Sequence, residues 1–214
     1  MAFFFNNDIF MKGFSFLLMI VLCNISCRQT YYIPNSVNVP MLEEKGDFEV
    51  KISNQDRSGP GIQLAYALKD DLGLMFNARW ENKKYESYSG LTSSGKNYLA
   101  EGAIGIFNSS ENNLIKYSLY GGLGYFNYKG KYGYTSNFSR LHALKSFVQV
   151  NFMSLDLKYI DFSIFSRFSN LYYFDVHYSI TEDEFINDLI YLESVDKKSI
   201  TWFIEPGIQL GIGK

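Results

Sequence analysis

The stretch that decides the fold runs from Ser199 to Gly213 and reads Ser-Ile-Thr-Trp-Phe-Ile-Glu-Pro-Gly-Ile-Gln-Leu-Gly-Ile-Gly. Alternate residues of this stretch, which we call one parity, are apolar, and the residues between them, the other parity, are mostly small or polar. The apolar parity holds Ile200, Trp202, Ile204, Pro206, Ile208, Leu210 and Ile212; the other holds Thr201, Phe203, Glu205, Gly207, Gln209, Gly211 and Gly213. This period of 2 predicts a strand with two different environments. In a soluble sandwich the apolar face would point inward, whereas in a membrane barrel it would point outward to lipid.

Seven earlier segments show a similar alternation and are also predicted to be strands. They lie at about 47–53, 61–68, 72–81, 97–107, 117–125, 144–152 and 160–169. The connections after the second, fourth and sixth strands are short, whereas 82–95, 128–142 and the segment after the seventh are predicted to be long loops. Short periplasmic turns alternating with longer outer loops are typical of bacterial outer-membrane proteins. The sequence therefore predicts an all-β fold, an eight-stranded antiparallel up-and-down β-barrel of outer-membrane type. Pro206 would remove one ladder donor, so a bulge is expected there.

Composition is consistent with one membrane-associated β domain. The chain has 214 residues, of which 18% are aromatic, and its net charge is -2. Many Tyr and Phe suit strands and interfacial aromatic belts. No basic stripe follows the chain, so a nucleic-acid partner has no support.

The parity opposite the apolar one carries charges that are predicted to face the barrel interior. An isolated buried ion costs several kcal/mol, roughly, so these groups are expected to pair with one another. Since an eight-stranded barrel is narrow enough for side chains to fill, we expect a plugged interior and no open pore. The predicted interior polar network consists of Glu49, Lys51, Arg79, Glu81, Glu101, Lys145, Asp161, Arg167 and Glu205.

The N-terminus is predicted to be a leader and a lipid anchor. The apolar run at 14–23 is too short to span a bilayer and is typical of a signal peptide. Met1–Phe10 lacks Lys and Arg, so Met11 is the expected true start. Cys27 follows a small residue, Ser26, where the leader should end, and is predicted to be the lipidated first residue, carrying acyl chains such as palmitate. The predicted divisions are a signal peptide at 1–26, a lipid-anchored tether at 27–46 and a β-barrel at 47–214.

One short helix is predicted in the last long loop, from Glu182 to Ser194. Thr181 and Glu184 form a capping box, and apolar residues follow at helical spacing. Such a helix could pack on the barrel rim, or it could bind a protein partner or act as a lid.

Catalytic and metal chemistry find little support. The only histidines are His142 and His177. An outer-membrane lipid esterase would need one of them beside a Ser and a carboxylate at the lipid-facing rim. No further ligands cluster at metal-binding spacing, so neither a metal nor another cofactor is expected. The glycines of Gly121-Gly122-Leu123-Gly124 are expected to make room for interior side chains rather than to bind phosphate.

From Cys27 onward the chain resembles the small outer-membrane β-barrel lipoproteins of Bacteroidetes-type bacteria. The residues that carry the resemblance are Cys27, Tyr32-Ile33-Pro34-Asn35, Val39-Pro40, Glu44-Lys45-Gly46-Asp47, Ala65-Tyr66-Ala67, Asp70, Leu72, Gly73 and Phe203-Ile204-Glu205-Pro206. The resemblance implies location and fold but no reaction.

The expected function is that of a non-enzymatic, lipid-anchored barrel of the bacterial outer membrane with a structural or interaction role. Its anchor would lie on the periplasmic side, and its partners would be outer-membrane lipid and a protein at the long loops or the helix. The main alternative is a soluble periplasmic lipocalin-like barrel that binds a small apolar ligand, which requires the charged parity to face water. The less favoured alternative is the lipid-modifying esterase.

Overall fold

The computed structural model describes residues 37–55, 59–86, 92–108, 115–133, 137–157, 160–180 and 186–212. Eight strands and one helix make up most of these residues. The strands are β1 (Phe48–Gln55), β2 (Gly59–Lys69), β3 (Leu72–Glu86), β4 (Thr92–Phe107), β5 (Ile115–Tyr132), β6 (Asn137–Leu157), β7 (Ile160–Ser179) and β8 (Ile200–Ile212), and the helix is α2 (Ile186–Lys198).

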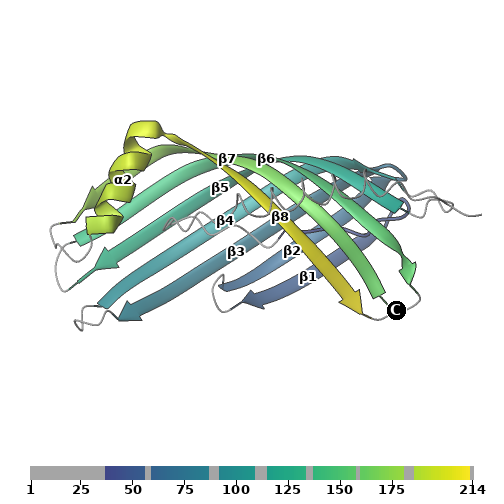
Figure 1. Cartoon of the computed structure of the whole chain (residues 1–214), viewed down its shortest axis with the longest axis horizontal. Helices are drawn as coiled ribbons and strands as arrows, with labels where there is room; N and C mark the ends of the chain where they lie inside the picture. The colour runs from purple at the N-terminus through teal and green to yellow at the C-terminus, as the bar shows by residue number, and fades with distance from the viewer. Residues whose placement is uncertain are drawn as a thin grey trace, which may run out of the picture.

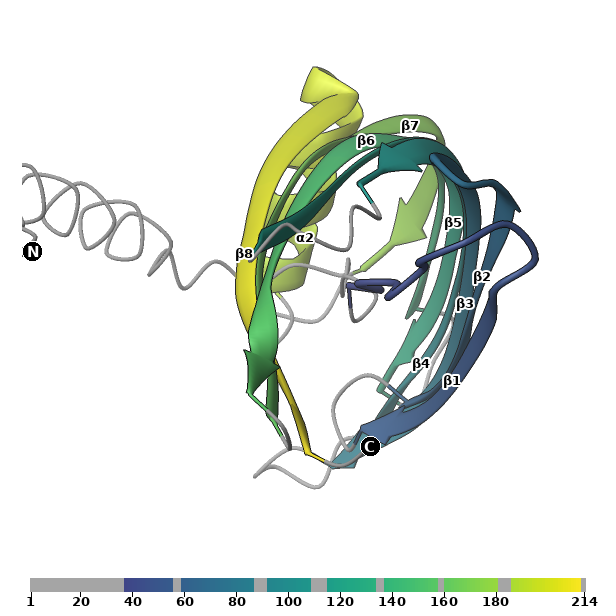
Figure 2. The ribbon, with the colours of Figure 1, turned by 90° about the vertical axis from the view of Figure 1, so that its right-hand side faces the viewer.

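All eight strands form one antiparallel sheet in the order β1 to β8, so each strand pairs with the next one along the chain. The strands run obliquely across the molecule (Figure 1). The sheet curls round on itself, with β1 and β8 as its two outermost strands (Figure 2). The predicted eight-stranded, antiparallel, up-and-down fold is confirmed.

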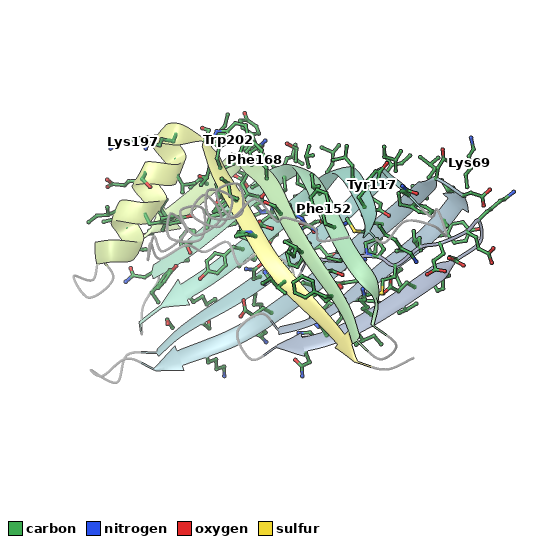
Figure 3. The ribbon with its side chains drawn as sticks, turned by 45° about the vertical axis from the view of Figure 1, so that its right-hand side comes forward. Lys69, Tyr117, Phe152, Phe168, Lys197 and Trp202 are labelled. Carbon is green, nitrogen blue, oxygen red and sulfur yellow. The ribbon has the colours of Figure 1, made fainter. Side chains whose placement is uncertain are left out.

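The two faces of the sheet are sorted by polarity in the predicted sense. Large apolar side chains are exposed on the outer face, where Leu123 is 71% and Ile208 66% exposed. Phe168 and Trp202 stack on this face with ring centroids 5.2 Å apart (Figure 3). On the inner face, Arg167 and Lys145 are at most 1% exposed. The charged parity therefore faces the interior.

The prediction of long loops at 82–95 and 128–142 is wrong, because most of these residues continue the strands. The β3–β4 ladder extends to the pair Glu86 and Thr92, and the β5–β6 ladder extends to Tyr132 and Asn137. Backbone hydrogen bonds do not depend on side-chain polarity. The loss of apolar residues at the outward positions therefore ends the alternation in the sequence without ending the strand.

The bulge predicted at Pro206 is also wrong. Pro206 pairs with Ser166 in a ladder that keeps its register from Ile160 to Tyr172. A proline without an N–H is tolerated where the backbone nitrogen faces away from the paired strand, and β8 is an outermost strand of the sheet order.

The predicted helix is present, although α2 extends beyond Ser194 to Lys198. The predicted capping residues, Thr181 and Glu184, lie outside the described residues. Ser199 ends the helix in a left-handed conformation (φ 55°), and its N–H donates to the Val195 carbonyl at 2.8 Å.

Candidate functional site

A cluster of four charged side chains occupies the interior of the curled sheet. Glu101 of β4, Lys145 of β6, Arg167 of β7 and Glu205 of β8 each project from the inner face. Lys145 Nζ lies 2.7 Å from Glu101 Oε1, and Arg167 Nη1 lies 3.1 Å from Glu101 Oε2. Glu205 lies further away, with its carboxylate 3.5 Å from Lys145 and 3.9 Å from Arg167. Two cations and two carboxylates therefore neutralise each other.

Glycine on β5 lets the ion cluster form. Gly124 pairs with Glu101 on one side and with Lys145 on the other, so it lies directly between the two charged residues. A Cβ at Gly124 would lie 2.9 Å from Cγ of Glu101 and 2.8 Å from the Ala100 carbonyl oxygen. At Gly122 a Cβ would collide with the Phe147 ring, whereas Gly121, on the outer face, has nothing within 4 Å. The prediction that these glycines make room for interior side chains is confirmed at Gly122 and Gly124.

Phe147 and Gln149 complete the cluster, and neither belongs to the predicted interior network. The Arg167 guanidinium carbon lies 4.4 Å from the centroid of the Phe147 ring, and Lys145 Nζ lies 5.5 Å from it. Gln149 Oε1 accepts from Arg167 Nε at 3.0 Å and from Nη2 at 2.6 Å. Both residues share the parity of Lys145, which is the signal that could have found them.

The chain segment before β1 reaches into the same interior space (Figure 2). Asn38 and Val39 are at most 1% exposed. The Asn38 carbonyl accepts from Gln149 Nε2 at 2.6 Å, and the Val39 carbonyl accepts from Lys51 Nζ at 3.0 Å. Part of the predicted tether, residues 37–46, is therefore a strap that packs against the interior polar residues. We refer to residues 37–46 as the N-terminal strap.

The remaining predicted network residues lie on β1, β3 and β7. Glu49 and Lys51 pair at 2.6 Å beside the N-terminal strap and are about one quarter exposed. Arg79 and Glu81 are buried on the inner face of β3, at 3% and 7% exposure. The backbone of Asp161 pairs with Gly211, but its side chain lies outside the described residues.

Apolar clusters lie towards both ends of the interior. We call the end of the sheet that holds α2 and the β3–β4 and β5–β6 connections the loop end, and the end that holds the β2–β3 turn the turn end. At the loop end, Leu192 and Val195 of α2 pack in one cluster with inner-face residues that include Phe126 and Leu171. At the turn end, Leu42 of the N-terminal strap packs with Ala65, Ala67 and Phe107. The ion cluster is thus enclosed between α2 and the strap.

A tight turn fixes the N-terminal strap to the start of β1. The Glu44 and Glu43 amides donate to Asp47 Oδ2 at 3.0 and 2.7 Å. These two hydrogen bonds favour the carboxylate and lower the pKa of Asp47 below its usual 3.8.

The two histidines lie side by side on the outer face near the loop end. Asp175 Oδ1 lies 2.8 Å from His177 Nε2, and Asp175 Oδ2 lies 3.7 Å from His142 Nε2. Arg140 Nε donates to His142 Nε2 at 2.9 Å. Since an arginine Nε–H can only donate, Nε2 accepts this hydrogen bond. The Tyr125 hydroxyl lies 2.5 Å from His142 Nδ1, and Asn127 Nδ2 lies 3.0 Å from the same nitrogen. No serine hydroxyl is among the partners of His142 in the described residues.

Within the described ranges, no group of three or more His, Cys, Asp and Glu residues could hold a metal ion. No helix among these same residues is long and apolar enough to cross a bilayer. Cys27 and the signal peptide predicted at 1–26 lie outside them.

Comparison with known proteins gives no relative. No protein-family model, no curated protein and no solved structure matches this chain.

Proposed function

We propose that this chain is an integral barrel of the bacterial outer membrane, without an open pore and without catalytic activity, serving a structural or interaction role. The observation that carries the proposal is the apolar outer face. Fully burying one large apolar side chain is worth about 1.5–3 kcal/mol. An exposed apolar surface that extends over many strands marks a membrane or partner interface.

The exposed apolar side chains extend over all eight strands, from Ile52, 82% exposed, on β1 to Trp202, 59% exposed, on β8. Lipid around the sheet would cover every one of them. The alternative of a soluble lipocalin-like barrel requires the charged parity to face water, and the inward position of Arg167 and Lys145 argues against it.

The interior arrangement supports a plugged barrel. The ion cluster is formed by side chains from β4, β6, β7 and β8, and the N-terminal strap and α2 close in on it from either end. We therefore expect no continuous path for ions or solutes through the interior. The exposed side of α2, including Ile190 and Lys197, is the surface that we propose for a protein partner.

The environment of His142 supports a non-enzymatic role. A general base must accept a proton from its nucleophile, but the Nε2 lone pair of His142 is engaged by Arg140. The esterase would require Arg140 to withdraw and a serine to approach.

The direct test is carbonate extraction of outer membranes that contain the full chain, followed by gel electrophoresis with and without boiling. We expect the chain to stay in the pellet and to change mobility on boiling. Release into the supernatant without a mobility shift would contradict membrane insertion. Planar bilayers should show no stepwise conductance, and stable channels would contradict the plugged interior.

The lipid anchor is a separate part of the proposal. We expect radiolabelled palmitate to be incorporated by the wild type and by Cys23→Ser but not by Cys27→Ser. Because the barrel itself would hold the chain in the bilayer, Cys27→Ser should still resist carbonate extraction. Equal labelling of both variants would contradict lipidation at Cys27. The resemblance to Bacteroidetes-type outer-membrane lipoproteins remains a prediction.

A further inference from the structure

A basic band crosses the outer face of the sheet at the loop end. Lys96 of β4, Lys129 of β5 and Arg140 of β6 are directly opposite one another in the ladders. Lys84 of β3 and Lys131 of β5 lie in the next row towards the loops. All five side chains are exposed. We refer to these five residues as the basic band.

The basic band has little internal charge compensation. Like charges directly opposite each other on neighbouring strands are destabilising, and Lys129 has a cation opposite it on both sides. On β7, His177 is directly opposite Arg140, and Asp175 lies one row away, opposite His142. Asp175 lies 4.0 Å from Arg140 and is shared with both histidines. In the rows that hold the band, the described outward positions of β3, β4 and β5 include no carboxylate. An anion from outside the chain would relieve this repulsion.

The band is continuous with the apolar outer face. Along β3 the outward residues change from Phe76 to Trp80, then to Asn82 and Lys84. Trp80 and Tyr98 are opposite each other and are 50% and 45% exposed. Lys96 lies two residues beyond Tyr98, or about 7 Å along the strand. A ligand that fits this surface has an apolar body beside the aromatic residues and anionic groups directly above them.

We propose that the basic band binds the phosphate groups of an anionic lipid in the leaflet at the loop end. This inference rests on the membrane insertion proposed above and names the lipid class that the outer face prefers. Neighbouring strands lie about 4.8 Å apart, so one phosphate can contact cations from two strands at once. The lipid chains would cover the apolar side chains below.

The asymmetry between the two ends of the barrel supports this orientation. At the turn end, Lys116 pairs with Glu43 at 2.6 Å, and the β2–β3 turn places Asp70 and Asp71 next to Lys69. Lys69 stands at the end of the molecule opposite to α2 (Figure 3). The turn end is thus mixed in charge, whereas the loop end carries a band of one sign.

The test uses the folded full chain in neutral detergent and two purified probes, phosphorylated lipid A and dephosphorylated lipid A. Binding of each probe to the fluorescently labelled chain is titrated. We expect the phosphorylated lipid to bind at least about tenfold more tightly, because each cation near a charged lipid surface contributes to binding. Equal affinity for the two lipids would overturn the proposal.

Two double variants locate the site. Lys96→Gln with Lys129→Gln should weaken binding of the phosphorylated lipid about tenfold or more and leave the dephosphorylated lipid unaffected. The matched control, Lys45→Gln with Lys69→Gln, removes the same charge from exposed positions at the turn end and should change little. An equal loss in both double variants would mean that net charge alone attracts the lipid.

Two further measurements separate the outcomes. Every protein is first checked for its heat-dependent mobility shift, because a wild type without this shift would refute the proposed barrel and not only its lipid preference. Inorganic phosphate is then added as a competitor. We expect inorganic phosphate to displace the lipid only at a far higher concentration than that of the lipid. Displacement at equal concentration would overturn the lipid proposal and identify a free anion as the ligand.

Discussion

The two faces of β6 differ sharply in polarity and in exposure. Leu144, Val148 and Phe152 on the outer face are each more than half exposed, whereas Lys145 and Gln149 on the inner face are at most 1% exposed. A soluble domain places these residue types the other way round. The difference shows that strand alternation fixes which residues share a face, while the surroundings decide which face is buried.

Removing the charge of Glu101, whose carboxylate contacts both Lys145 and Arg167, should have the largest effect on the free energy of unfolding. Glu101→Gln leaves Lys145 and Arg167 with Glu205 as their remaining carboxylate in the cluster. Removing one partner of a buried ion pair costs about 3–5 kcal/mol. We expect the free energy of unfolding in detergent, measured by urea titration with tryptophan fluorescence, to fall by this amount. Glu193→Gln on the exposed side of α2 is the control, and an equal effect there would contradict the role of the cluster.

Breaking the outer face should have the next largest effect. Leu123 lies near the middle of the apolar stretch of β5, and Leu123→Arg would place a charge where we propose lipid tails. Arginine on the lipid face near the bilayer centre costs about 2–4 kcal/mol. The measurement is urea unfolding in lipid vesicles, with Lys129→Arg, at the rim of the same strand, as a near-neutral control. No loss of stability in Leu123→Arg would indicate that this face meets water.

Two adjacent glycines of β5 sharpen the comparison between the faces. Gly122→Ala would force a methyl group against the Phe147 ring and to 2.6 Å from the Gly102 carbonyl oxygen. Overpacking of this kind costs about 1–3 kcal/mol. Gly121→Ala meets open space on the outer face. It should be neutral or stabilise by a few tenths of a kcal/mol, roughly. Urea midpoints that are equal for the two variants would contradict the assignment of the faces.

The smallest effect is expected at Asp47, where neither lipid nor the ion cluster is involved. Its pKa is lowered in the folded chain, so its contribution to stability is present above the unfolded value of about 3.8 and is lost as the pH falls through the folded value. We expect Asp47→Asn to lower the urea midpoint slightly at about pH 7, and this difference to shrink as the pH falls below about 3.8. A difference that grows as the pH falls would contradict this assignment.

The sequence predicted the faces well and the limits of the strands poorly. Alternation in β7 and β8 was enough to assign Arg167 and Glu205 to the interior. The loop-end portions of β3 to β6 were missed because Lys96 and Lys129 replace apolar residues at outward positions, and that change resembles a loop. The basic band lies in those missed portions.

The charged residues of the ion cluster were predicted from the sequence, whereas the residues that pack around them were not. Phe147 shares the inward parity of Lys145, but an aromatic ring beside two cations was not expected on a face assigned to polar residues. The N-terminal strap has no periodicity, and its contact with Gln149 joins residues that are 111 positions apart. Contacts of this length follow from the curling of the whole sheet and cannot be derived from neighbouring residues.

The position of the N-terminal strap has a consequence for the order of folding. Asn38 leaves the ribosome well before Gln149, yet its buried contact requires β6 to be in place. Contacts between distant parts of a chain form slowly, because the entropy of closing the loop is lost before the contact stabilises the fold. The strap is therefore among the first described segments to be synthesised and among the last to find its native partners. Until it does, the interior stays open at the turn end.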